Sequence, residues 1–214
     1  MENNGIFAVN KPVGITSHDV VDIVRKKTGV RRVGHGGTLD PLASGVLVIA
    51  VGRENTKRLD EFVKGEKEYI ATIFLGANST TDDEEGEKQN VNVKSLPNIS
   101  EIKESIKLFI GNIMQTPPIY SSVKISGKPS HRRVRHGEEV KLEPRAVIIK
   151  NIEILEYDYP ILRLNVTTGP GVYIRSLARD LGEKLKTGGY LKGLIRTRVN
   201  TFQLSEAIDL DKIT

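Results

Sequence analysis

The chain has 214 residues, of which 38% are apolar and 28% are charged, and it carries a net charge of +5 with no cysteine. This composition is typical of a globular protein with a sizeable core, and the length suits one large domain or two small ones. The lack of cysteine excludes disulfides, thiolate metal sites and cysteine nucleophiles. No stretch approaches about 20 consecutive apolar residues, and the first residues do not resemble a signal peptide, so we expect a cytoplasmic protein with no membrane span.

Hydrophobic patterning predicts strands and helices in the first half of the chain. Strands are expected at residues 5–12, 46–52 and 66–76. The run 46–52 is β-branched and apolar throughout, which is typical of a central strand buried on both faces. Ser17 is a good N-cap for a helix that ends at Gly29, and residues 54–63 also predict a helix.

The middle and second half continue the same mixed pattern. Residues 77–98 are polar and predict a surface loop, after which Ser100 is expected to cap a helix. Strands are expected at residues 146–156, 161–168 and 194–202. Apolar residues from Ile174 to Leu185 share one face of a predicted helix. The pattern indicates a mixed α+β fold in one domain.

Positive charge is concentrated in residues 124–150. This segment holds eight lysines and arginines and three glutamates, so its charge of 8 − 3 = +5 equals that of the whole chain. A solvated loop or hairpin is one interpretation of such a run. The other interpretation is an arm that lies along the phosphates of a nucleic acid.

Asp40 stands out because it ends the loop GHGGTLD, directly before the buried strand. From this fragment alone, an ordinary turn is the better explanation of an Asp-Pro pair that follows glycines. Three observations favour a functional site instead. The carboxylate lies near the core, the glycines at 34, 36 and 37 would let a ligand approach the backbone closely, and His35 is able to stack on a planar ring.

Other classes of site have no support in the sequence. The four histidines show no metal-binding spacing, so no metal is expected. The glycine-rich loop is neither a Walker loop nor a dinucleotide-binding fingerprint, and no GxSxG motif is present. A carboxylate enzyme without a cofactor and a non-catalytic binding protein remain.

The segment GHGGTLDPLASGVLVIAVGRENTK at 34–57 closely resembles the signature of the TruB family of pseudouridine synthases. Further segments resemble family motifs in the same order: NKPVGITSHDVV at 10–21, EKEYIATIFLG at 66–76, TPPIYSSVKISGK at 116–128, GPGVYIRSLARDLG at 169–182 and LIRTRVNTF at 194–202. A series of ordered motifs is far more specific than any one of them. The chain is therefore identified as a member of this family.

The resemblance implies an isomerase that converts uridine in RNA to pseudouridine, usually uridine 55 in the T loop of tRNA. It implies no metal and no cofactor, because nothing is oxidised, reduced or hydrolysed. The implied fold is a single α+β pseudouridine synthase domain over 1–214, with a mixed, mainly antiparallel sheet, flanking helices and a central cleft. A basic flap is expected at about 124–145. We expect a monomer that binds tRNA and needs no obligate protein partner.

The resemblance also assigns catalytic roles to single residues. Asp40 matches the aspartate that the family requires, either as a nucleophile or as a base at the sugar. Arg175 matches the arginine that pairs with it, and an adjacent guanidinium stabilises and orients a carboxylate. Tyr69 matches the tyrosine that stacks on the flipped uracil and is suited to proton transfer at C5.

Binding roles follow in the same way. Tyr173 and Leu194 match positions that line the uracil pocket. His35 matches the histidine that meets the RNA where the base leaves its stack, and flipping the base costs roughly a few kcal/mol of unstacking. Lys11 matches a residue of the N-terminal motif with a mostly structural role. In the basic flap, Arg132, Arg133 and Arg135 replace a more apolar stretch of the family and are expected to follow the RNA backbone.

Two departures from the family pattern bear on RNA binding. Family members usually continue into a C-terminal PUA domain, and none is expected within this chain. Residue 195 is isoleucine where arginine is common. Two rivals to the stand-alone synthase are considered: the guide-dependent branch of the family, and a tRNA-folding factor whose main role does not need turnover.

Overall fold

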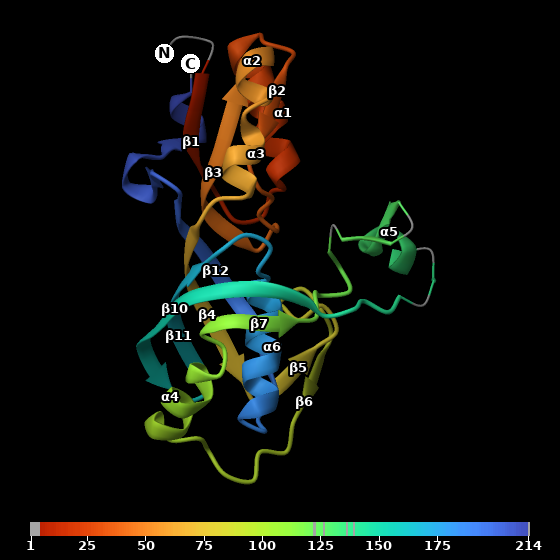
Figure 1. The fold of residues 1–214 in the computed structure, drawn as a ribbon, viewed down its shortest axis with the longest axis vertical. Coiled ribbons are helices and arrows are strands. Elements are labelled where there is room, and N and C mark those ends of the chain that lie inside the picture. The colour runs from red at the N-terminus through yellow and green to blue at the C-terminus, as the bar shows by residue number, and fades with distance from the viewer. Residues whose placement is uncertain (1–4, 122, 126, 136, 139, 214) are drawn as a thin grey trace. The chain divides into compact units, whose positions relative to one another are not determined.

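The computed structural model describes residues 5–121, 123–125, 127–135, 137–138 and 140–213 (Figure 1). The backbone divides into two compact units. The first consists of Met1–Ile70, Asn165–Pro170 and Gly193–Thr214, and the second of Ala71–Leu164 and Gly171–Lys192. Each unit is therefore discontinuous in sequence, and the single-domain boundary stays a prediction.

The first unit is built around a sheet centred on β3 (Ala43–Val51). The other strands of this sheet are β1 (Gly5–Lys11), β2 (Val33–His35), β12 (Gly189–Val199), β13 (Phe202–Gln203) and β14 (Ile208–Asp209). β1 is antiparallel to β3, whereas β12 is parallel to β3 and β14 is parallel to β1. β2 pairs with the last residues of β3, and β13 pairs with β12. The sheet is thus mixed, as the sequence predicted.

Both faces of β3 are buried, which explains its unbroken apolar sequence. Leu47 and Ile49 pack on one face with valines of α1 (Ser17–Thr28). Val46 and Val48 pack on the other face with Phe62, which belongs to α3 (Leu59–Val63). The expected central buried strand is confirmed, although it begins three residues earlier than predicted. The helix expected at 54–63 is two short helices, α2 (Arg53–Thr56) and α3.

The N-terminal end of α1 differs from the prediction by one residue. Thr16, not Ser17, is the N-cap, and its side chain forms a capping box with Asp19. A capping box satisfies two backbone donors that the helix leaves free. Gly29 ends the helix in a left-handed conformation, as predicted. Ser17 lies in the first turn, which leaves its hydroxyl free for a contact described below.

The second unit packs helices α4 (Ile99–Lys107) and α6 (Ile174–Lys184) with a sheet. Its strands include β7 (Gly111–Gln115), which is antiparallel to β10 (Arg145–Asp158), and β10 also neighbours β11 (Ile161–Thr168). β4 (Lys67–Leu75), β11 and β12 have residues in both units. Buried leucines and isoleucines of α4, α6 and β11 form the core, among them Ile102, Ile106, Leu162, Leu164, Leu177 and Leu181.

Several features of the second unit were not expected. β5 (Ala77–Ser79) and β6 (Lys88–Asn90) form a small hairpin within residues predicted to be a loop, and β7 was also missed. Asn98, not Ser100, caps α4 with its own capping box. The expected basic flap contains β8 (Lys124–Ile125), β9 (Lys128–Pro129) and α5 (Ser130–Arg135). Two short 3-10 helices, Leu204–Glu206 and Leu210–Lys212, complete the first unit, and none of the described helices is long and apolar enough to cross a membrane.

Candidate active site

Asp40 lies in a tight turn whose backbone is held on several sides. The Ser17 hydroxyl accepts a hydrogen bond from the Leu39 amide (2.8 Å) and donates one to the Leu39 carbonyl (3.0 Å). On the C-terminal side of Asp40, the Ala43 amide donates to the Asp40 carbonyl (3.0 Å). Lys11 donates from its buried ammonium group to the Ala43 carbonyl (2.7 Å). The first unit therefore fixes the backbone on both sides of Asp40.

Arg196 is the central cation of this unit, and it is only 1% exposed. Its guanidinium donates to the carbonyl of Val46 (2.7 Å), of Gly37 (3.0 Å) and of Thr38 (3.5 Å). These contacts join β12 to the start of β3 and to the loop that precedes Asp40. Gly37 adopts a φ of +101°, which favours glycine. Arg196 is a site residue that the sequence analysis did not select.

Tyr69 lies on β4 and is 7% exposed. Burial raises the pKa of its hydroxyl, while the positive charge of Arg196 and a hydrogen bond from it act in the opposite direction. Asp40 is close enough to influence the same pKa. The structure thus brings Asp40 and Tyr69 within electrostatic range of each other, and Arg196 interacts with both. Tyr69 keeps its proton at neutral pH, so it is able to donate a hydrogen bond or a proton.

Two buried lysines lie near Arg196, and one of them, Lys11, also lies near Asp40. Burial lowers the pKa of Lys11 to about 8, with Asp40 opposing and Arg196 reinforcing the shift. Burial and then Arg196 lower the pKa of Lys67 to about 8. The Lys67 ammonium donates to two carbonyl groups at the end of α3. Both lysines are therefore charged at neutral pH and begin to lose that charge near pH 8.

His35 and Leu194 also lie in the first unit. His35 ends β2 opposite Ile49, and its buried Nδ1 has no hydrogen-bond partner among the residues that the structure describes. Burial, followed by the charge of Arg196, lowers the pKa of His35, so the ring is neutral at neutral pH. Leu194 is half-buried and pairs with Ala43, three residues after Asp40. The register therefore places Leu194 beside the start of β3, close to Asp40 in sequence, and His35 nearer the other end of that strand.

The glycines of the loop also have structural roles. A Cβ atom at Gly34 would lie 2.8 Å from Leu59, and one at Gly36 would lie 2.9 Å from Phe62. The space beside both glycines is filled by side chains of α3, which accounts for their small size. These two glycines are therefore needed for packing against α3, and their role in admitting a ligand stays a prediction. Gly37, by contrast, is required by its backbone conformation.

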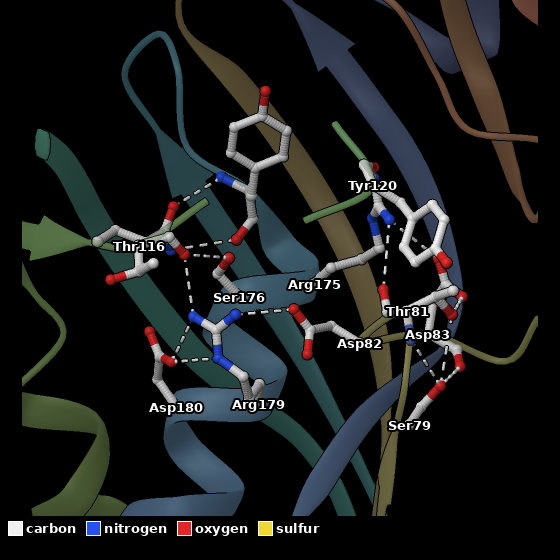
Figure 2. A network of polar contacts seen from close by, with 12 residues as sticks. Ser79, Thr81, Asp82, Asp83, Thr116, Tyr120, Arg175, Ser176, Arg179 and Asp180 are labelled. Atoms are coloured by element: carbon white, nitrogen blue, oxygen red, sulfur yellow. Dashed lines mark hydrogen bonds and ion pairs between the residues drawn. The ribbon is translucent and has the colours of Figure 1, made fainter. Parts of the chain in front are cut away.

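Arg175 lies near the start of α6 in the second unit, where it forms a buried ion pair with Asp83 (3.3 Å). Its guanidinium also donates to the carbonyl of Tyr120 (2.8 Å) and of Thr81 (3.3 Å). Figure 2 shows these groups around the arginine. Asp83 is only 3% exposed, although it belongs to the acidic run that was predicted to be a surface loop. The pairing of Arg175 with Asp40 concerns residues of two units and stays a prediction.

A second arginine pairs with the same acidic segment one helical turn later. Arg179 forms ion pairs with Asp82 (2.7 Å) and Asp180 (2.8 Å) and donates to the Thr116 carbonyl (2.9 Å) (Figure 2). Asp82 has a φ of +61°, which is uncommon for a residue other than glycine. Adjacent aspartates thus bind two arginines of α6, and the second pair holds the turn that presents Asp83.

Tyr173 precedes α6 and is fixed through its backbone. The Gln115 side chain accepts from the Tyr173 amide (2.9 Å) and donates to its carbonyl (3.1 Å). The guanidinium of Arg145 lies 5.1 Å from the centre of the Tyr173 ring, within the range of a cation–π contact. The Arg145 guanidinium therefore lies over the Tyr173 ring.

One arginine of the basic flap is paired with an acidic side chain. Arg133 forms an ion pair with Glu138 (2.9 Å). The side chains of Arg132 and Arg135 lie outside the described residues. Within the described part of the chain, no group of three or more histidine and acidic side chains is placed to hold a metal ion.

Comparisons with known proteins agree on one family. The model of the TruB family pseudouridylate synthase, N-terminal domain, matches residues 25–174. A protein named tRNA pseudouridine synthase B from Corynebacterium diphtheriae is 46% identical, over 100% of this chain and 73% of its own length. Proteins of the same name from Trichormus variabilis and Protochlamydia amoebophila are each 42% identical over 96% of this chain and over 71% and 78% of their own lengths.

Solved structures give the same result. A chain of a crystal structure entitled "Crystal Structure of a Cbf5-Nop10-Gar1 Complex" is 30% identical, with a TM-score of 0.76 over 98% of this chain. A chain of "Structure of H/ACA RNP bound to a substrate RNA containing 2'-deoxyuridine" is 28% identical, with a TM-score of 0.72. This chain spans about half the length of those solved chains, at 53% and 52%. On the family match and the relatives at 42–46% identity, the chain belongs to the TruB family of pseudouridine synthases.

Proposed function

We propose that this chain converts uridine 55 in the T loop of tRNA to pseudouridine. Membership of the family makes the chain an RNA-modifying isomerase, and the names of its relatives assign tRNA as the class of substrate. The observation that carries the proposal is the turn that holds Asp40 rigidly, with Tyr69 and Arg196 close by in a buried, positively charged setting. A plain binding protein has no need for such a setting around one carboxylate.

The reaction exchanges one glycosidic bond for another. The bond between N1 of uracil and C1′ of ribose breaks, the base turns over, and a bond forms between C5 and C1′. The proton on C5 is lost and N1 regains one, so the change is an isomerisation. Asp40 acts at the sugar, either as a nucleophile at C1′ or as a base, and both roles need an ionised carboxylate. Arg196 and Lys11 favour that ionised form.

The remaining roles concern the base. Tyr69 is proposed to stack on the flipped uracil and to take part in proton transfer at C5, which is supported by its burial and its protonated hydroxyl. Leu194 and Tyr173 are proposed to line the uracil pocket. The neutral ring of His35 is suited to stacking where the base leaves the RNA. Arg175 is proposed to pair with Asp40, with Asp83 fixing its direction.

Finer properties belong to the same proposal. We expect the enzyme to be a cytoplasmic monomer that binds the T arm of tRNA without a cofactor or an obligate protein partner. Lys11 serves mainly to hold the Asp40 turn. Arg132, Arg133 and Arg135 are proposed to contact phosphates. If they do, replacing all three with alanine lowers the slope of log affinity against log salt by roughly two to three units.

The test is to incubate the purified chain with unmodified tRNA transcript and to map pseudouridine. We expect product at position 55 from the wild type. Asp40→Asn should abolish turnover and keep most of the tRNA affinity, because it removes the charge and changes the shape little. Tyr69→Phe should keep binding but lose much of the rate. Binding without product in the wild type would instead support a tRNA-folding factor.

A further inference from the structure

A wide cavity of about 620 Å³ lies in the first unit, and nothing in the proposed reaction uses it. Three arginines, on the last turn of α1 and in the loop before β2, form much of its wall. The lining residues are Arg25, Arg31, Arg32, Val33, Gly34 and Thr56. We call this feature the arginine cavity.

The arginines differ from most others in the described part of the chain. Arg31 and Arg32 are exposed, and neither has an ion-pair partner among the described residues. Arg25 is fixed by Asp22 (2.8 Å) and by the Val33 carbonyl (3.1 Å), so its guanidinium is held in place in the cavity wall. Two exposed guanidinium groups beside a third that is fixed concentrate positive charge here, which favours an anionic ligand.

The chemistry of the wall favours phosphate groups. A guanidinium presents several donors in a planar fork that matches the oxygens of a phosphate. The volume argues against a single free anion, because one water molecule takes up only about 30 Å³ of liquid. The cavity volume of about 620 Å³ is comparable to the volumes of sites that bind ligands much larger than a single anion. A stretch of nucleic-acid backbone supplies several phosphates and the required size.

The register of the sheet places this cavity at a distance from the catalytic aspartate. Gly34 in the cavity wall pairs with Ala50 near the end of β3, whereas Asp40 precedes Ala43 at the start of that strand. Seven residue steps of strand, at roughly 3.3 Å each, separate Ala43 from Ala50, or about 23 Å. We therefore expect a ligand in the arginine cavity to lie away from the reacting base.

We propose that the arginine cavity binds the phosphate backbone of the substrate RNA, several nucleotides from the uridine that reacts. This inference rests on the proposed function for the identity of the RNA. Binding in the cavity contributes affinity for the RNA and positions the RNA along β3. The cavity takes no part in breaking or forming the glycosidic bonds. It follows that its loss affects binding and its salt dependence, and leaves the rate at saturating tRNA unchanged.

The test compares two double variants with equal loss of charge. Arg31→Ala/Arg32→Ala removes the two unpaired arginines, and Lys94→Ala/Lys103→Ala removes two exposed cations of the second unit that have no partner among the described residues. Affinity for a tRNA transcript is measured by fluorescence anisotropy at several potassium chloride concentrations. For two phosphate contacts we expect the arginine variant to lower the log–log slope by about 1.4–1.8. Its affinity at low salt should fall about tenfold or more, whereas the lysine variant should follow the wild type.

A second measurement locates the contact on the RNA. Ethylation of single phosphates in the tRNA removes their charge, and the wild type should be sensitive to ethylation at one or two phosphates several nucleotides from the target. The Arg31→Ala/Arg32→Ala variant should lose that sensitivity and keep it elsewhere. Two results would overturn the proposal. One is an equal slope of log affinity against log salt for the wild type and both double variants; the other is the same sensitivity to phosphate ethylation in the arginine variant as in the wild type.

The outcomes separate this inference from the proposed function. If the wild type binds tRNA but makes no pseudouridine, and the arginine variant still changes the salt slope, the cavity binds RNA and the proposed reaction is wrong. If the wild type makes pseudouridine and the arginine variant binds like the lysine variant, the reaction stands and the cavity proposal fails. A turnover rate that falls at saturating tRNA would contradict the assignment of the cavity to binding alone.

Discussion

The Ser17 hydroxyl offers a sharp test of how the Asp40 turn is held. Ser17 is 2% exposed, and its two hydrogen bonds satisfy both the amide and the carbonyl of Leu39. Ser17→Ala leaves both groups buried without that partner, at a cost of about 1–3 kcal/mol each. Alanine recovers a few tenths of a kcal/mol through its helix propensity. The expected loss in the free energy of unfolding is therefore about 1.5–5.5 kcal/mol.

The same variant should slow the reaction more than it weakens tRNA binding. Leu39 directly precedes Asp40, so loss of the anchor lets the carboxylate move, and a misplacement of about 1 Å can lower a catalysed rate about 100-fold. The assay is the rate of pseudouridine formation at saturating tRNA, with affinity measured separately. Thermal unfolding at a temperature well above that of the assay shows that the variant is folded when it is measured.

Thr16→Ala is the matched control, one residue away. Thr16 caps α1 with a capping box but does not contact Leu39. Its loss should cost about 0.5–2 kcal/mol of stability and leave turnover near that of the wild type. If the two variants lost turnover in proportion to their lost stability, the hydroxyl of Ser17 would have no specific effect on Asp40, and the reasoning would fail.

Three further predictions concern buried charges. The pKa of Lys67 is about 8 in the folded state, below its usual 10.5, so between about pH 8 and 10.5 the unfolded chain binds more protons than the folded one. Over this range the unfolding free energy of the wild type should rise relative to that of Lys67→Met, by at most about 1.4 kcal/mol per pH unit. Urea unfolding measures this difference, and a flat or falling difference contradicts the lowered pKa. Asp82→Asn and Arg179→Met should each destabilise the chain, and a double-mutant cycle should give a coupling of about 1–3 kcal/mol; additive effects would show that the pair is not coupled. Arg196→Lys should lower both stability and turnover, because an ammonium group cannot reach three separated carbonyls as the guanidinium does; a wild-type rate in the pseudouridine assay would exclude Arg196 from the site.

The sequence predicted those helices and strands whose pattern of apolar residues matches their pattern of burial. β3 was recognised because both of its faces are buried, and α6 because its apolar residues share one face. β7 was missed because its burial does not follow its hydrophobicity: apolar Met114 is exposed, whereas polar Gln115 is buried. The caps were misplaced by one or two residues because Thr16 and Ser17 are both good N-caps, and only tertiary contacts show that Ser17 is used elsewhere.

The site was predicted as far as motifs reached. Asp40 and Tyr69 lie in recognisable segments and were selected as candidates, whereas Arg196 and Asp83 were not. Asp83 lies in the run DDEEGE, which is strongly polar and typical of a surface loop. Its burial depends on Arg175, which is distant in the sequence, so no local pattern indicates it. For Arg196 one signal was available. It follows Leu194 by two residues on a strand, which puts both side chains on the same face of the sheet.

The choice of arginine rather than lysine at position 196 follows from the charges that surround Asp40. Burial in this unit is strong enough to lower the pKa of both Lys11 and Lys67 to about 8, so a third lysine in the same setting would also lose its proton just above neutral pH. Burial lowers the pKa of Arg196 as well, but from a starting value far above the physiological range. The guanidinium therefore stays charged when the two lysines become neutral. It continues to stabilise the ionised form of Asp40 and to hold the carbonyls of Gly37 and Thr38. A site that needs one carboxylate ionised and fixed in direction is thus better served by a buried arginine than by the lysines beside it.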